Sequence, residues 1–90
     1  MNDKIEAARV EWREGRVENA LMVLQDSALK DTYQAIFLQG EIQYSQQNWG
    51  EALNSFRHCL QLDPHSREAK TYVGLILNIL GFFHTDQFNP

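Results

Sequence analysis

An internal repeat limits the folds open to this chain of 90 residues more than any other feature. The segment that starts at Gly15 aligns with the segment that starts at Gln47, at an offset of 32 residues. The segment that starts at Ala35 aligns with the one that starts at Ala69, at an offset of 34. Such periods are typical of arrays in which each unit buries its apolar face against its neighbours. We therefore expect about two and a half copies of one unit.

Each unit is expected to be a pair of helices, because apolar residues recur at helical spacing and no segment alternates with a period of two for long. Ile5, Ala8 and Trp12, for example, share one side of the first helix. We expect five helices: one that Gly15 ends, then helices over about 17–29, 33–46 and 49–62, and a last one over about 67–80.

Local signals mark where several of these helices begin and end. Asp31 or Thr32 can cap the third helix, and Ser66 can cap the fifth. Asn48 has the spacing of a capping box with Glu51, three residues later. The fourth helix should end at Asp63–Pro64, since a residue before proline is disfavoured in helical geometry.

The middle unit resembles a tetratricopeptide repeat, whose pattern is W-x2-L-G-x2-Y, then A-x3-F, then P. Three positions of that pattern are substituted, and the other units keep fewer of its residues. In the middle unit, the residues that match the pattern are Gly40, Ala52, Phe56 and Pro64, and its first, second and fourth residues are replaced by Ile36, Gln39 and Gln43. The first unit keeps Gly15, Ala20 and Leu24. The third unit keeps Val73, Gly74 and Gly81.

The resemblance implies an all-α, right-handed superhelix of antiparallel helix pairs, as one domain over residues 1–90. Its units would be about 1–32 and 33–66, followed by a half unit 67–81 and a C-terminal tail 82–90. Small residues should lie where the two helices of a unit cross, and larger ones should fill the space between units. The small residues are Ala8, Gly40, Gly74, Ala20 and Ala52, and the larger ones are Leu24 and Phe56.

The resemblance also implies a concave groove, lined by the first helix of each unit, that binds an extended peptide or a helix. A clamp for a C-terminal carboxylate is not expected, because Glu41 and Glu68 would repel it and only Arg9 has a suitable charge. The groove residues expected by analogy are Ile5, Arg9, Trp12, Arg13, Phe37, Glu41, Tyr44, Thr71, Leu75 and Asn78.

The function expected on this basis is that of a small adaptor or scaffold that binds a protein partner, like short stand-alone bacterial proteins of this family. Two alternatives stay open at this point. The chain could be a homo-oligomeric structural module, such as a homodimer, or a dedicated chaperone for one client subunit. The adaptor predicts a monomer with a free groove, the module predicts self-association, and the chaperone predicts instability without its client.

An uncharged apolar stretch runs from Tyr72 to Phe83 and is too short for a membrane span, which needs about twenty residues. A solenoid normally ends on a polar face, so this stretch needs a cover. Either Phe88 in the tail turns back onto it, or a second copy packs there. The apolar stripe available for either contact comprises Ile76, Ile79, Leu80 and Phe83.

Composition argues against several other classes. The net charge is −4 and no basic patch is visible, so nucleic-acid binding is not expected. A single cysteine, Cys59, and the lack of a signal sequence favour a cytoplasmic protein. His58 and Cys59 are adjacent and point apart on a helix, so no metal site is expected, and no nucleophile or phosphate-loop motif indicates an enzyme or a cofactor. Trp12 could pack within its unit or serve as an anchor in the groove.

Overall fold

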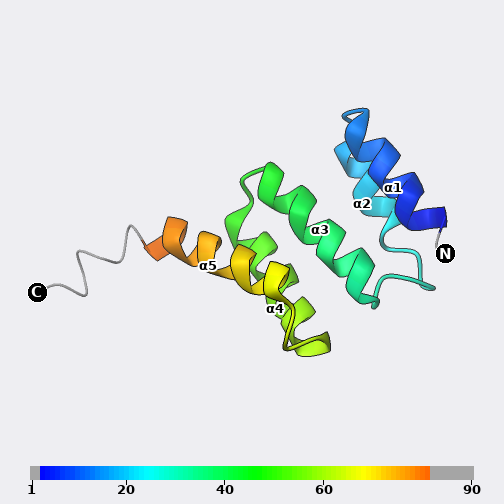
Figure 1. The fold of residues 1–90 in the computed structure, drawn as a ribbon. Helices are drawn as coiled ribbons and strands as arrows, with labels where there is room; N and C mark the ends of the chain where they lie inside the picture. Colours follow the sequence, from blue (N-terminus) through cyan, green and yellow to red (C-terminus); the bar gives the residue numbers. More distant parts are fainter. Residues whose placement is uncertain (1–2, 82–90) are drawn as a thin grey trace, which may run out of the picture.

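The computed structural model describes residues 3–81, and this part of the chain is helical without any strand. Its five helices are α1 (Asp3–Arg13), α2 (Val17–Val23), α3 (Tyr33–Ser45), α4 (Trp49–Leu62) and α5 (Arg67–Gly81) (Figure 1). Successive helices pack on each other as pairs, with α1 against α2 and α3 against α4, and α5 packs on α4. The all-α class and the number of helices are therefore confirmed. The predicted contacts of Phe83 and Phe88 lie outside the described residues.

The turns within the two helix pairs have the same backbone form. Gly15 and Gln47 both adopt a positive φ, of 88° and 63°. After each of them, a backbone N–H reaches back five residues: Arg16 donates to the carbonyl of Glu11 at 2.8 Å, and Asn48 to that of Gln43 at 2.9 Å. This is the Schellman motif, which satisfies carbonyls at the end of a helix. Positions that align in the sequence thus share a conformation.

This turn explains why the capping box predicted at Asn48 is wrong. Asn48 is the residue before α4, but its side chain makes no capping hydrogen bond. In a capping box, the side chain of the third helical residue, here Glu51, binds the backbone N–H of the cap. That N–H already donates to Gln43, so the box cannot form.

The two other predicted caps are confirmed. The hydroxyl of Thr32 accepts a hydrogen bond from the N–H of Ala35 at 3.3 Å at the start of α3. The hydroxyl of Ser66 accepts one from the N–H of Ala69 at 3.1 Å at the start of α5. In each case a side-chain oxygen satisfies a donor that the helix itself leaves unpaired.

α2 is shorter than predicted, ending at Val23 instead of near residue 29. Asp26 helps to keep the segment after α2 from continuing the helix. Its Oδ1 accepts from the N–H of Ala28 at 2.8 Å, a local bond that competes with helix formation. Its Oδ2 lies 2.6 Å from Nζ of Lys4 on α1, and the hydrogen bond from Lys4 lowers the pKa of Asp26. The turns that follow bury Leu29 in the core.

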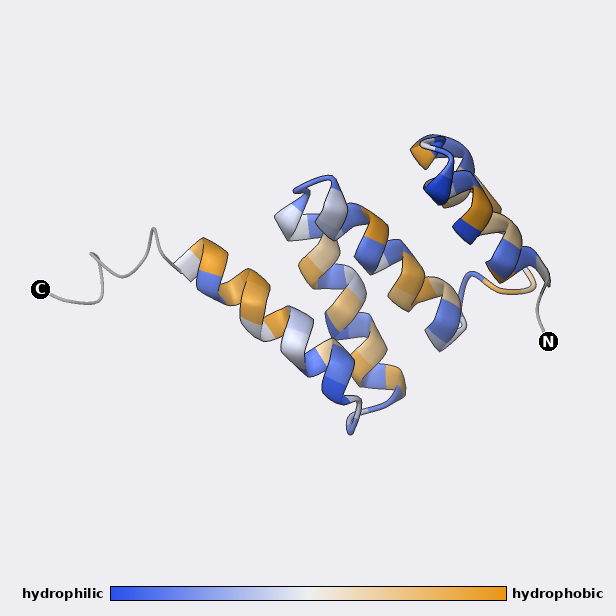
Figure 2. Ribbon diagram, turned by 45° about the horizontal axis from the view of Figure 1, so that its top comes forward, coloured by the Kyte–Doolittle hydropathy of each residue, from blue (hydrophilic) through white to orange (hydrophobic). Residues whose placement is uncertain are grey.

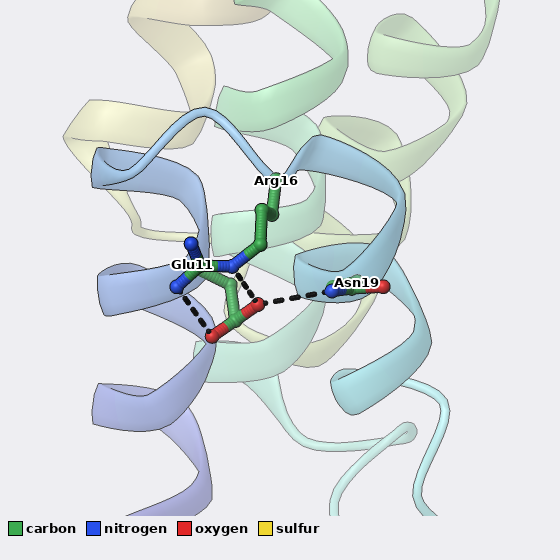
Figure 3. A network of polar contacts seen from close by, with 3 residues as sticks. All are labelled: Glu11, Arg16 and Asn19. Carbon is green, nitrogen blue, oxygen red and sulfur yellow. Dashed lines mark hydrogen bonds and ion pairs between the residues drawn. The ribbon is translucent and has the colours of Figure 1, made fainter.

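A polar contact joins the ends of α1 and α2 (Figure 3). Arg16 donates from Nε and Nη2 to the two oxygens of Glu11, at 2.7 and 3.1 Å, and Asn19 donates to Oε1 at 3.2 Å. The hydrogen bond from Arg16 is the main cause of the lowered pKa of Glu11. Exposed ion pairs stabilise little, so this contact mainly orients the turn.

Three groups of buried residues form the core. The first is aliphatic and lies between α1, α2 and α3, with Ala8, Ala20 and Leu24 at its centre. The second is built around Phe56 and Ile76, where α3, α4 and α5 meet, and is rich in aromatic rings. The third is small and contains Ile36, Cys59 and Ala69. α3 contributes to all three packing regions.

The crossing of α3 and α4 is as close as predicted. A Cβ atom built on Gly40 would lie 2.8 Å from Cζ of Phe56, which is shorter than real Cβ contacts allow. Gly74 was expected to lie at an equivalent crossing, and this expectation is wrong. A Cβ there would meet nothing within 4 Å, because α5 has no following helix among residues 3–81 to cross it.

The two glutamines that depart from the repeat pattern are paired through Ser55 on α4. Gln39 donates to the hydroxyl of Ser55 at 3.2 Å, and that hydroxyl donates to Gln43 at 2.6 Å. Gln25 also donates to Gln39 at 2.9 Å. Ser55 is buried, so hydrogen bonds to its hydroxyl avoid the cost of an unpaired polar group. The polar substitutions in α3 are thus matched by a polar residue on α4.

Candidate functional site

A hollow of about 400 Å³ lies where α1, α3 and α5 approach one another, and we refer to it as the central hollow. α3 forms its floor, and α1 and α5 contribute its sides. Its lining residues are Arg9 from α1, Tyr33, Gln34, Phe37, Leu38 and Glu41 from α3, and Glu68 and Tyr72 from α5.

Aromatic rings support the central hollow. Tyr72 stacks on Phe56 with ring centroids 4.3 Å apart and an angle of 3° between the planes. Phe37 forms a T-shaped pair with each of these rings, with its centroid 5.3 Å from that of Phe56 and 5.7 Å from that of Tyr72. Phe56 is completely buried, whereas Phe37 and Tyr72 are partly exposed. A fixed ring beneath two partly exposed ones gives a rigid apolar surface, which costs little entropy to use in binding.

Hydroxyl groups hold the rings of Tyr72 and Tyr33 in place. The hydroxyl of Tyr72 donates to Oε2 of Glu41 at 3.3 Å, so a bond joins α5 to α3 across the hollow. The hydroxyls of Tyr33 and Ser66 are 2.5 Å apart. Burial raises the pKa of Tyr72, and the negative charge of Glu41 raises it further. Tyr72 therefore remains a neutral donor at physiological pH.

The charged residues of the hollow are unevenly placed. Glu41 on α3 is partly exposed, Glu68 on α5 is exposed, and Arg9 approaches from α1. Within residues 3–81, none of these three forms an ion pair; the ion pairs there involve Lys4, Arg13 and Arg16. The hollow thus presents two carboxylates and one guanidinium to a ligand.

The structure brings together three of the residues expected in the groove: Arg9, Phe37 and Glu41. Ile5 is buried in the aliphatic core. Thr71, Leu75 and Asn78 are exposed on α5 but do not line the hollow.

The remaining groove residues have contacts of their own. Trp12 packs on the aliphatic core and is partly exposed. Arg13 is exposed and lies 3.8 Å from Glu6. Tyr44 packs edge-on against Trp49 and Tyr72, with centroids 5.1 Å away in both cases. Tyr44 therefore contacts Tyr72 without lining the hollow itself.

Several lining residues were not expected in the groove from the sequence, namely Tyr33, Gln34, Leu38 and Tyr72. Glu68 was considered only as a residue that would repel a C-terminal carboxylate. Helical spacing carries a signal for most of them. Tyr33, Phe37 and Glu41 follow one another at intervals of four residues, as do Glu68 and Tyr72, so each set shares one face of its helix. The contact between the two faces depends on packing and has no signal in the sequence.

The apolar stripe on α5 faces mainly inward in its described part. Ile76 is completely buried against α4, and Leu80 packs on the same cluster. Ile79 is partly exposed. The apolar residues exposed on this helix are instead Leu75 and Leu77, at 45% and 43%. Figure 2 shows the apolar character of the half of α5 nearest the C-terminus.

Three further features of residues 3–81 concern metal ions, the single thiol and membranes. No group of three or more histidine, cysteine or acidic side chains lies close enough to hold a metal ion. Cys59 is buried, which raises the pKa of its thiol to about 11. None of the helices in this range is both long enough and apolar enough to cross a membrane.

Comparison with known proteins adds no assignment. No family model matches the chain, and no curated protein matches it.

Proposed function

We propose that this protein is a small interaction module of the tetratricopeptide-repeat kind, which binds an extended peptide segment of a partner and carries out no catalysis. The observation that supports the proposal most is the central hollow, where partly exposed rings lie beside charges that form no ion pair within residues 3–81. Aromatic residues held in a rigid hollow are typical of energetic centres in protein interfaces. The shared turns at Gly15 and Gln47 support the repeat architecture.

The site can be tested by filling it. Gln34 lines the hollow and is exposed, so Gln34→Trp adds volume there without disturbing the core. Peptides would first be selected from a random display library on the wild-type protein, and their binding measured by fluorescence anisotropy. We expect Gln34→Trp to weaken binding at least about ten-fold.

Gln61→Trp is the matched control, because Gln61 is exposed on α4 and lies outside the hollow. It should bind the selected peptides as the wild type does. Equal affinity of all three proteins, or a failure of the library to yield any binder, would contradict the proposal.

A second function, self-association, is favoured by one observation: Leu75 and Leu77 are exposed on a helix without charge between residues 72 and 81. Light scattering across a concentration series tests it, with Leu77→Glu as the variant. A dimer in the wild type that is lost in Leu77→Glu would support self-association, and a monomer at all concentrations would exclude it.

We also propose a cytoplasmic location. The supporting observation is the buried free thiol of Cys59, which fits a reducing compartment. Localisation of a fluorescent fusion in the native host tests this proposal.

A further inference from the structure

We infer that the segment bound in the central hollow is basic, with an arginine or lysine side chain placed between Glu41 and Glu68. The inference rests on the proposed function, and it adds the chemistry of the partner. It is carried by the charges of the hollow, by the aromatic rings beside them, and by the position of Arg9.

The two carboxylates leave room for a cation. Glu41 uses Oε2 to accept from Tyr72, and within residues 3–81 its Oε1 accepts no hydrogen bond. Glu68 has no hydrogen bond from a side chain in the same range. Both line the central hollow, Glu41 from α3 and Glu68 from α5, so a cation in the hollow meets negative charge from two helices. A hydrogen bond to a charged group is stronger than one between neutral groups.

The aromatic surface suits the same ligand. Tyr72 and Phe37 line the hollow next to the carboxylates, and Phe56 fixes Tyr72 from below. A guanidinium or ammonium group near the face of an aromatic ring gains cation–π attraction. The aliphatic part of an arginine or lysine side chain also packs well on such rings.

Arg9 sets the orientation and the selectivity. It lies on the α1 side of the hollow, so a ligand's cation is directed away from it and towards α5. An acidic ligand could pair with Arg9, but it would meet the two carboxylates. The net charge of the whole chain, −4, attracts basic segments over longer distances as well.

The test uses three acetylated and amidated nine-residue peptides that share a glycine–serine background. The first has two arginines separated by a leucine, the second has glutamines in place of the arginines, and the third has glutamates. Binding is measured by NMR titration of the full-length labelled protein, with the amides of Tyr33, Phe37 and Tyr72 as reporters. We expect the arginine peptide to bind about five- to thirty-fold more tightly than the glutamine peptide, and the glutamate peptide most weakly.

Variants then assign the preference to the hollow. Glu41→Gln should reduce affinity for the arginine peptide about three- to ten-fold, and its amide oxygen can still accept from Tyr72. Glu68→Gln should reduce it about two- to five-fold. Glu51→Gln is the matched control for Glu68, because each acid lies in the first turn of its helix and Glu51 is exposed outside the hollow. It should change affinity less than about two-fold.

Arg9→Gln gives a result of opposite sign. Removing this positive charge should raise affinity for the arginine peptide about two-fold or more. Arg57→Gln is the control, because Arg57 is exposed on α4, and it should change this affinity much less. Added salt should weaken binding of the arginine peptide more than that of the glutamine peptide.

The outcomes separate this inference from the proposed function. If peptides bind in the hollow and those with glutamine or glutamate bind as well as the arginine peptide, the basic preference is wrong and the peptide site stands. If Glu41→Gln and Glu68→Gln bind the arginine peptide as the wild type does, the preference is also overturned. If no peptide, including library-selected ones, shifts the reporter amides, both the inference and the peptide site fall.

Discussion

The sequence segments that begin at Ala35 in α3 and at Ala69 in α5 align with each other, yet the two helices have different surroundings. Gly40 on α3 lies against Phe56 of the following helix, so closely that no Cβ would fit. Gly74 on α5, 34 residues later, faces open space. The same residue at the same repeat position is thus required by packing in one place and unconstrained in the other. Whether packing requires a small residue at such a position therefore depends on whether another helix crosses there.

The largest effect should come from removing the ring that makes the crossing close. Phe56 is completely buried against Gly40, Phe37 and Tyr72, so Phe56→Ala should lower the free energy of unfolding by about 3–5 kcal/mol. Urea unfolding followed by circular dichroism measures this. Phe56→Leu, which leaves a smaller cavity, should lose less, and Met22→Ala, at a side chain 71% exposed, should be nearly neutral. Equal losses for Met22→Ala and Phe56→Ala would contradict the packing.

The next largest loss of stability should come from adding a side chain at Gly40, on the other side of its contact with Phe56. Gly40→Leu should lower the free energy of unfolding by about 1–3 kcal/mol, because Phe56 and the ring stacked on it must move. Thermal melts of Gly40→Leu, Gly40→Ala and the double variant Gly40→Ala/Phe56→Leu measure the coupling. Leucine is shorter than phenylalanine and leaves room for the new methyl group, so the double variant should lose less than the sum of its parts. An unchanged melting curve for Gly40→Leu would refute the close crossing.

The free energy of unfolding, measured over a series of pH values, tests the burial of Cys59 in the small cluster where α3, α4 and α5 meet. Burial raises the pKa of Cys59 to about 11 from 9.0, so the unfolded chain loses the thiol proton before the folded chain does. Stability should therefore be unaffected below pH 9 and should fall as the pH rises from 9 towards 11, by about 1 kcal/mol at pH 10. Cys59→Ala should lack this part of the decline. Because the pKa of Tyr72 is also raised, the difference between the two proteins is the quantity to compare.

The smallest effect, and one of opposite sign, is expected on α5. Gly74→Ala should raise the free energy of unfolding by about 0.5–1 kcal/mol, because alanine favours a helix over glycine and its methyl group meets no neighbour. Melts at two protein concentrations measure it. If Gly74→Ala instead destabilises the protein, some other surface covers this face of α5, and a dependence on concentration would identify that surface as a second copy.

Helix positions were predictable where the signal is local. The caps at Thr32 and Ser66, the turn at Gly15 and the stop before Pro64 were all read from residues next to one another. The capping box at Asn48 was wrong because the backbone N–H of Asn48 is already used within the same turn. The length of α2 was wrong where a residue of another helix contributes. α2 ends early at a turn whose Asp26 is paired with Lys4 on another helix.

The candidate site was predictable only in part for the same reason. Arg9, Phe37 and Glu41 were expected because the repeat pattern places them on the first helices of their units. Tyr72 was not, because its role depends on stacking against Phe56 and on a hydrogen bond to Glu41, which are contacts between helices. The inward position of Ile76 likewise follows from how α5 lies on α4.

The way α1 and α2 join the other helices has a consequence for hydrogen exchange. This pair contacts the rest of the described chain mainly through α3, on one aliphatic cluster, and α2 is only seven residues long. Its amide protons should exchange through local opening well before those of α3 and α4. Arg9, one side of the central hollow, belongs to this less protected pair. A ligand that spans the hollow would therefore slow exchange at α1, at amides it never touches.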